Sequence, residues 1–329
     1  MNLPLYPETP AERDAWIVAH RAERGPLDPY KPQACLLEEE RAASGEIVSV
    51  ATIFLTNREC PWRCTMCDLW RHTLTEPTPP GAIPEQIEYA LEQLASDTSA
   101  ARQTPQAIKL YNSGSFFDPR AIPPSDHFAI SQAVRSFERV IVENHPALIG
   151  DACLRFRDLL SGDFEIAMGL ETAHPDVLEK LNKRLTLDQF RSAAEFLTRH
   201  GIALRVFILV QPPFMPPDEA LHWAERSLDF AFDCGATAAT LIPTRAGNGA
   251  MEALAENGKF APPPLATLES AMDYGLKLRR GRVFADLWDL PRPIDCPGCG
   301  AARAARLRAM NLSQSIAPRI SCPLCGGRS

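Results

Sequence analysis

The chain has 329 residues, of which 45% are hydrophobic and 23% are charged, and its formal net charge is −7. This composition is typical of a globular protein with a sizeable core, so it excludes a disordered chain, a collagen-like fibre and a disulfide-stapled miniprotein. The acidic balance argues only weakly against nucleic-acid binding, because basic residues can still gather in one patch.

Targeting and membrane signals are missing from the sequence. The first 14 residues lack the basic start and apolar run of a signal peptide, and no stretch reaches the roughly 18 apolar residues of a membrane span. We therefore expect a soluble, cytoplasmic protein that does not bind membranes. In that reducing compartment, clustered cysteines hold metal more often than they form disulfides.

Elements are predicted from position 47 onward. The first 46 residues contain six prolines and are expected to form an irregular lead-in with an amphipathic stretch at 11–24. Strand candidates are 47–56, 107–112, 139–143, 164–170, 202–210, 236–243 and a final 283–287. Helix candidates are 84–96, 125–137, 146–160, 187–200, 217–234 and 265–280. This alternation predicts repeated βα units.

The composition of the strands indicates how the sheet is covered. Residues 206–210 are apolar throughout, which suits a parallel strand with both faces buried. Gly201 and Gly235 follow two of the helices, as expected for left-handed caps. The pattern favours an α/β fold, either a full or partial barrel or a doubly wound sheet.

Three cysteines follow the first long strand. Cys60, Cys64 and Cys67 have the spacing CxxxCxxC. Three thiolates on one loop can each bind one iron of a cubic 4Fe-4S cluster and leave the fourth iron without a protein ligand. The loop also lies at the carboxyl end of a strand, where parallel β/α folds build their active sites. The alternatives are a structural zinc knuckle and a ferredoxin-like electron carrier completed by a distant cysteine.

This loop and the βα pattern behind it resemble the radical S-adenosylmethionine (SAM) superfamily. The resemblance implies a partial (β/α)6 TIM-like barrel with a 4Fe-4S cluster and SAM as cofactors. In that superfamily, the amino and carboxylate groups of SAM chelate the fourth iron. An electron from the cluster then cleaves SAM to a 5′-deoxyadenosyl radical, which abstracts hydrogen from a substrate. The resemblance also implies a reducing partner such as flavodoxin or ferredoxin.

The resemblance further implies roles for residues at the strand ends. The predicted SAM-binding residues are Met66, Asn112, Ser113, Gly114, Ser115, Glu171, Gln211 and Ile242. Met66 occupies the position that touches the adenine, and the segment 111–115 occupies that of a motif that receives the SAM amino group. An ordinary polar turn would have a similar sequence at 111–115. Glu143 and Glu171 are the predicted catalytic residues, because polar groups at this end of a barrel face the active site.

Four segments narrow the resemblance. The segments 111–118, 143–146, 169–172 and 212–214 together resemble the Elp3-like branch, and within it the group of the archaeosine-biosynthesis radical SAM enzyme. That enzyme acts on a modified deazaguanine in tRNA. The resemblance therefore implies a modified tRNA base, or a related small metabolite, as the substrate.

A second group of cysteines lies near the carboxyl terminus. Cys296, Cys299, Cys322 and Cys325 form two CPxCG knuckles, which predicts a closed site for zinc or for an auxiliary iron-sulfur cluster. We thus expect a lead-in at 1–46, a barrel at 47–290 and a metal-binding tail at 291–329. Arginines between and beyond the knuckles, at positions 303, 306, 308, 319 and 328, could either bind a phosphate backbone or be solvated. They leave open a non-catalytic, metal-stapled nucleic-acid-binding module.

Overall fold

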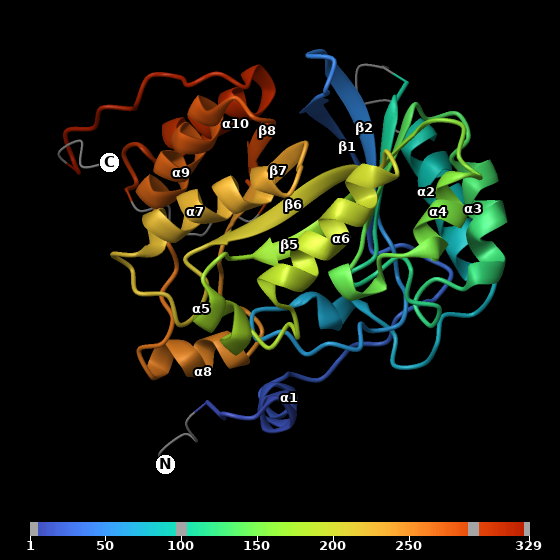
Figure 1. The fold of residues 1–329 in the computed structure, drawn as a ribbon, viewed down its shortest axis with the longest axis horizontal. Coiled ribbons are helices and arrows are strands. Elements are labelled where there is room, and N and C mark those ends of the chain that lie inside the picture. Colours follow the sequence, from blue (N-terminus) through green and yellow to red (C-terminus); the bar gives the residue numbers. More distant parts are fainter. Residues whose placement is uncertain (1–5, 97–103, 289–295, 326–329) are drawn as a thin grey trace.

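The computed structural model describes residues 6–96, 104–288 and 296–325. Its strands form one curled sheet in the sequential order β1 to β8 (Figure 1). The strands are β1 (Ala34–Arg41), β2 (Ile47–Phe54), β3 (Ala107–Tyr111), β4 (Arg139–Glu143), β5 (Asp163–Glu171), β6 (Ala203–Val210), β7 (Ala238–Pro243) and β8 (Arg282–Ala285). Each pair of neighbours from β2 to β8 is parallel, whereas β1 runs antiparallel to β2.

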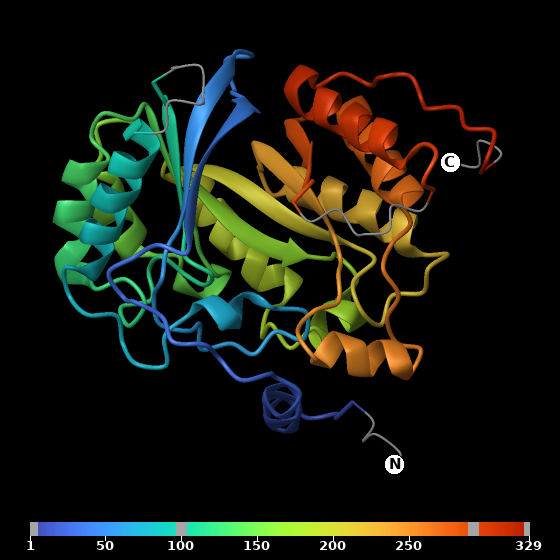
Figure 2. The same ribbon diagram turned by 180° about the vertical axis from the view of Figure 1, so that it is seen from behind.

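Most helices connect these parallel strands and cover the outer face of the sheet (Figure 2). The helices of the described residues are α1 (Pro10–Ala19), α2 (Ala82–Ser96), α3 (His127–Ala133), α4 (Asp151–Arg157), α5 (Pro175–Lys180), α6 (Leu187–Arg199), α7 (Ala220–Asp233), α8 (Ala250–Glu256), α9 (Leu265–Leu278) and α10 (Gly300–Ser313). Of these, α1 precedes the sheet and α10 follows its last strand. Short 3-10 turns span Leu69–His72, Pro124–Asp126 and Pro146–Leu148. Within the described residues, no helix is both long and apolar enough to traverse a bilayer.

The predicted partial barrel is confirmed. Its sheet has more parallel strands, β2 to β8, than the six of the predicted (β/α)6 barrel. All seven predicted strands are present, the last as β8. Gly201 and Gly235 have φ angles of 69° and 88°, so both are the left-handed caps that the sequence predicts. The predicted boundary between barrel and tail, at 290 and 291, lies outside the described residues.

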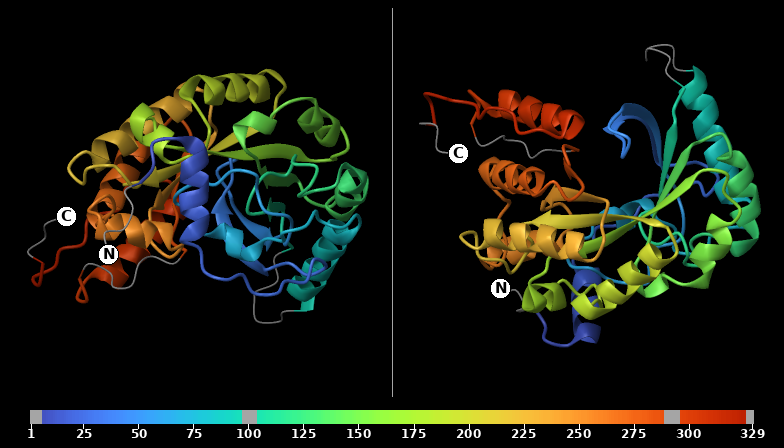
Figure 3. Two further views of the ribbon diagram at one scale, coloured as in Figure 1. Left: turned by 90° about the horizontal axis from the view of Figure 1, so that it is seen from below. Right: turned by 45° about the horizontal axis from the view of Figure 1, so that its top comes forward.

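The lead-in is more ordered than its prolines suggest. The predicted amphipathic stretch at 11–24 contains most of α1, at residues 10–19, whereas residues 34–41, which were expected to be irregular, form β1. Strand β1 carries three consecutive glutamates, which are uncommon in strands, and this composition conceals it in the sequence. In the structure, Glu40 points into the half-barrel and pairs with cations there. Helix α1 lies across the carboxyl end of the barrel (Figure 3).

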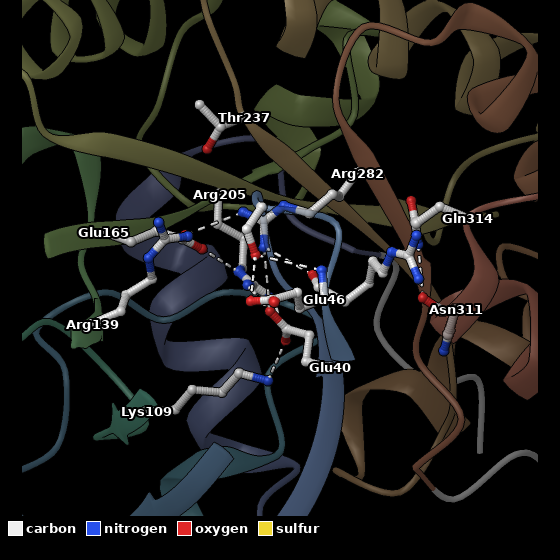
Figure 4. A network of polar contacts seen from close by, with 12 residues as sticks. Glu40, Glu46, Lys109, Arg139, Glu165, Arg205, Thr237, Arg282, Asn311 and Gln314 are labelled. Atoms are coloured by element: carbon white, nitrogen blue, oxygen red, sulfur yellow. Dashed lines mark hydrogen bonds and ion pairs between the residues drawn. The ribbon is translucent and has the colours of Figure 1, made fainter. Parts of the chain in front are cut away.

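The amino-terminal end of the half-barrel is filled by charged side chains from several strands (Figure 4). Arg205 lies between Glu165 and Glu40, with Nε 2.6 Å from Glu165 Oε1 and Nη1 3.0 Å from Glu40 Oε2. Lys109 Nζ is 2.7 Å from Glu40 Oε2, and Arg282 Nη2 is 3.4 Å from Glu165 Oε2. Burial opposes ionisation of Glu40, but Arg205 and Lys109 outweigh it and hold its pKa well below the usual range.

Candidate functional site

The loop with the first three cysteines packs against the turn that follows β3. Gly114 lies so close to Cys60 that a Cβ atom added to the glycine would be 3.4 Å from the cysteine's own Cβ. The ring of Trp62, in the same loop, stacks on the ring of His145 at a centroid distance of 3.7 Å. The predicted SAM-binding turn and the cysteine loop are therefore in direct contact.

Backbone carbonyl groups of the same loop are held by buried amides from elsewhere in the chain. Asn248, just before α8, donates from Nδ2 to the carbonyls of Thr65 and Cys67 at 2.8 and 3.1 Å. Asn182, after α5, donates to the carbonyl of Arg63 at 2.8 Å. These contacts fix the loop conformation without using the sulfur atoms, so the thiols stay available as ligands.

The lead-in also contacts this loop through ion pairs and a hydrogen bond. Glu59, next to the first cysteine, pairs with Arg21 at 2.7 Å and with Arg24 at 2.6 Å. The hydroxyl of Tyr6 lies 2.7 Å from that of Thr65. The ordered lead-in is therefore part of the site, a role that its sequence does not suggest.

Burial suppresses ionisation of the three thiols in the loop. Burial raises the pKa of Cys60 to about 12 and that of Cys67 to about 11, and it also raises the pKa of Cys64 well above its usual value. Such thiols stay protonated at neutral pH unless a metal stabilises the thiolate. Among the described residues, the group close enough to hold a single metal ion is the carboxyl-terminal one, not this loop. A cubic cluster binds each thiolate to a different iron, so it does not require the three sulfur atoms to surround one ion.

Glu143, at the end of β4, organises the turn after β3. Its Oε1 atom accepts hydrogen bonds from the backbone amides of Asn112 at 2.5 Å and Gly114 at 3.3 Å. Ser113, between them, has a φ of 53°, and the hydroxyl of Ser115 accepts from the amide of His145 at 3.0 Å. Burial raises the pKa of Glu143 to about 7, although the backbone amides act in the opposite direction. The structure thus shows Glu143 positioning the turn, and its predicted catalytic role stays a prediction.

Glu171, at the end of β5, is engaged by a lysine that the sequence analysis did not identify. Its carboxylate pairs with the buried Nζ of Lys183, and its own φ is 66°. A side chain at Gly169 would collide with this pair, so the glycine makes room for it. Burial opposes ionisation of Lys183, but Glu171 and the nearby Cys64 raise its pKa. The lysine therefore brings positive charge next to the cysteine loop.

Two predicted SAM-binding residues have buried polar atoms without a partner. Neither Nδ2 nor Oδ1 of Asn112, and not Oε1 of Gln211, has a hydrogen-bond partner among the described residues. The amide nitrogen of Gln211 does donate to the carbonyl of Ala261 at 2.7 Å. Unpaired buried polar groups are costly and rare. Their presence at the carboxyl end of β3 and β6 fits a polar ligand such as SAM.

An apolar cluster lies beside two further predicted SAM-binding residues. Met66 and Ile242 border one apolar cluster, in which Leu209 and Met215 are buried. This provides an apolar surface beside the cysteine loop. Arg245, in the turn after β7, donates to the carbonyl of Trp288 at 3.2 Å and lies 3.8 Å from the carboxylate of Asp68.

The four carboxyl-terminal cysteines converge as predicted. All four sulfur atoms lie within 4.8 Å of one another. Backbone amides of Cys325 and Leu324 lower the pKa of Cys322 to about 7, as expected of a knuckle turn. The four residues therefore form a group that could hold a metal.

Two of the tail arginines are buried in ion pairs, whereas Arg308 and Arg319 are exposed, as the solvated alternative predicts. Arg303 Nη2 lies 2.6 Å from Glu269, and Arg306 Nη2 lies 2.7 Å from Asp273. Both arginines are only 4% exposed. They bind α10 to α9, which removes them from any nucleic-acid surface, and position 328 lies outside the described residues.

Sequence reasoning missed Lys183, Asn248 and the contacts of the lead-in. Asn248 is followed by Gly249, whose φ is 86°, and this Asn-Gly pair after a predicted strand is a usable signal for an ordered turn. Lys183 carries no comparable signal, because its role depends on a loop that returns to the cysteines from a distant part of the chain.

The chain is similar in sequence to two curated proteins of the same name. No protein-family model matches the chain. Archaeosine synthase subunit beta from Methanosarcina acetivorans is 27% identical over 293 residues, covering 83% of this chain and 82% of the relative. The protein of the same name from Thermococcus kodakarensis is 27% identical over 212 residues, covering 62% of this chain and 64% of the relative.

Solved structures show the same architecture. Elp3 from Methanocaldococcus infernus, lacking its amino terminus, matches with a TM-score of 0.51 and 14% identity, over 72% of this chain and 62% of that one. Methylornithine synthase matches with a TM-score of 0.51 and 13% identity, over 78% of this chain and 68% of that one. Both are radical SAM enzymes. The chain therefore resembles radical SAM enzymes of the Elp3-like branch in its fold and archaeosine synthase subunit beta in its sequence.

Proposed function

We propose that this protein is a radical SAM enzyme that binds a 4Fe-4S cluster through Cys60, Cys64 and Cys67. The observation that carries the proposal is the contact between the cysteine loop and the 112–115 turn, where buried polar atoms of Asn112 have no partner in the part of the chain that the structure describes. When bound, the cluster supplies the electron that cleaves SAM to a 5′-deoxyadenosyl radical for hydrogen abstraction.

The protein's own residues would then bind and orient SAM. Asn112 and Gln211 would pair their free polar atoms with the polar groups of SAM, and Met66 and Ile242 would contact its adenine. Glu143 would keep the 112–114 turn in shape by accepting its backbone amides. Lys183 would place a positive charge beside the thiolates, which favours their ionised form.

The substrate we propose is a modified tRNA base or a related small metabolite. This rests on the similarity to relatives named archaeosine synthase subunit beta, and the word subunit further suggests a partner chain. A flavodoxin or ferredoxin would deliver the electron. The rival function, a non-catalytic nucleic-acid-binding module, loses part of its support because Arg303 and Arg306 are buried in ion pairs, which leaves Arg308 and Arg319 as its exposed arginines.

The test is anaerobic reconstitution with iron and sulfide, followed by reduction in the presence of SAM. The full-length chain should turn brown and release 5′-deoxyadenosine, measured by mass spectrometry. Cys64→Ala should do neither, whereas the matched control Cys35→Ser, in β1, should behave as the wild type. A wild-type protein that holds the cluster and never cleaves SAM with any reductant would overturn the proposal.

A substrate assay follows from the same preparation. Bulk tRNA and a free modified base are supplied separately, and consumption of each is followed together with 5′-deoxyadenosine. Faster SAM cleavage with tRNA than with the free base would support a tRNA substrate. Stimulation by the free base alone would indicate a small metabolite.

A further inference from the structure

The four-cysteine group has the dimensions of a site for one tetrahedral metal ion. The sulfur atoms of Cys296 and Cys322 are 3.8 Å apart, and so are those of Cys299 and Cys325. Four Zn–S bonds of about 2.3 Å in a tetrahedron place the sulfur atoms about 3.8 Å from one another. A disulfide requires about 2.05 Å, and a cubic iron-sulfur cluster spreads its four thiolates over four separate irons. The geometry thus fits a single tetrahedral ion, and four thiolates in two knuckles are the ligand set of structural zinc.

The site joins the two ends of one segment. Cys299 is the N-cap residue of α10, and the backbone amide of Arg303 donates to the Cys299 carbonyl at 2.9 Å. The second knuckle, at 322 and 325, follows after the chain has left the far end of α10 and returned. A metal here therefore closes a loop that contains the whole helix, and closing a loop in this way restricts the unfolded chain.

Helix α10 in turn caps the outer edge of the sheet. Gln314 accepts from the amide of Val283 at 2.7 Å and donates to the Val283 carbonyl at 2.8 Å. Asn311 accepts from the amide of Ala285 at 2.8 Å and donates to the Ala285 carbonyl at 2.9 Å. Two side-chain amides thus satisfy β8 where a further strand would otherwise pair.

The same helix spans the seam between the two edge strands of the half-barrel. It packs against both β1 and β8, and its Leu307 and Met310 are buried in the main core. At this seam Arg282 of β8 donates to the carbonyl of Arg41 of β1 at 3.2 Å. The helix therefore closes the opening that an incomplete barrel leaves between its first and last strands.

We propose that Cys296, Cys299, Cys322 and Cys325 bind one Zn²⁺ and that this ion locks α10 over the seam between β1 and β8. The zinc is structural, because four thiolates leave no open coordination position. This role is independent of SAM chemistry at the other cysteine loop.

Metal content tests the identity of the ion. The full-length chain, purified anaerobically from cells supplied with both metals, should contain about one zinc together with about four irons per chain. Replacing zinc by Co²⁺ should give the absorption bands of a tetrahedral tetrathiolate site. About eight irons and no zinc would overturn the proposal by showing a second cluster.

Hydrogen exchange tests the lock. The double variant C296S/C322S should lose zinc, and the amides of Val283 and Ala285 should exchange about tenfold faster or more, while those of β5 keep their protection. C35S is the matched control and should keep both zinc and slow exchange. The double variant N311A/Q314A should keep zinc but exchange faster at the same two amides.

A second measurement covers the case in which the cysteine variants fail to fold. Zinc is then removed from the folded wild-type protein with a chelator, and exchange at the same two amides is compared before and after zinc is restored. Faster exchange that reverses on adding zinc supports the lock. Unchanged exchange after zinc loss overturns it, and neither result depends on SAM cleavage.

Discussion

The two ends of the half-barrel use polar side chains in opposite ways. At the amino-terminal end, Glu165 and Arg205 are buried and paired with one another and with neighbouring charges. At the carboxyl end, Asn112 and Gln211 are buried to the same degree, yet polar atoms in both lack partners among the described residues. A satisfied network stabilises the fold, whereas an unsatisfied one marks a place where a ligand can bind.

Removing a cysteine at the carboxyl end of the half-barrel should produce the largest effect on activity. Cys64→Ala should reduce SAM cleavage to the uncatalysed background, because two thiolates cannot hold the cubic cluster in its site-differentiated form. The unfolding free energy of the metal-free protein should change by less than about 1 kcal/mol. Product analysis and urea denaturation measure the two quantities. A variant that unfolds before it loses activity would erase the contrast between the two ends.

Breaking the charged network at the amino-terminal end of the half-barrel should instead destabilise the whole protein. Glu165→Gln leaves Arg205 and Arg282 buried with less negative charge, and loss of one partner from such a network costs about 3 to 5 kcal/mol. Glu38→Gln is the matched control, because this side chain is 38% exposed and should cost less than about 1 kcal/mol. Equal losses of unfolding free energy in the two variants would argue against a tightly coupled network.

Glu143 should make stability depend on pH in a defined direction. Its folded pKa is about 7 and its usual value is 4.5, so folding favours the protonated form. The stabilisation is complete below pH 4.5 and is lost as the pH rises through about 7. Glu143→Gln should remove this decline, an effect on the order of 1 to 3 kcal/mol across the interval. Parallel slopes in the two proteins would show that Glu143 titrates normally.

The smallest effect on stability is expected from an unpartnered amide. Asn112→Ala removes two buried polar atoms that have no partner, so the unfolding free energy should stay within about 1 kcal/mol of the wild type or rise. SAM binding to the reconstituted protein should weaken about tenfold, equivalent to about 1.4 kcal/mol. Calorimetric titration measures it. Unchanged affinity would show that the free amide serves another ligand.

The sequence predicted the features that depend on local pattern. Apolar runs such as 206–210 located the strands, and cysteine spacing located the carboxyl-terminal group of four sulfur atoms, because each signal lies within a few neighbouring residues. The glutamates of β1 concealed this strand in the sequence, because their partners Lys109 and Arg205 come from strands far along the chain. Lys183 and Asn248 were missed for the same reason, since their contacts arise only when distant loops converge.

The amides of Asn311 and Gln314 also bear on how the protein behaves at high concentration. An exposed strand edge is a template on which a second chain can add, and such addition leads to aggregation. By occupying the backbone of Val283 and Ala285, these two side chains deny that template to other molecules. A shortened chain that ends before α10 would therefore expose this edge and should aggregate more readily.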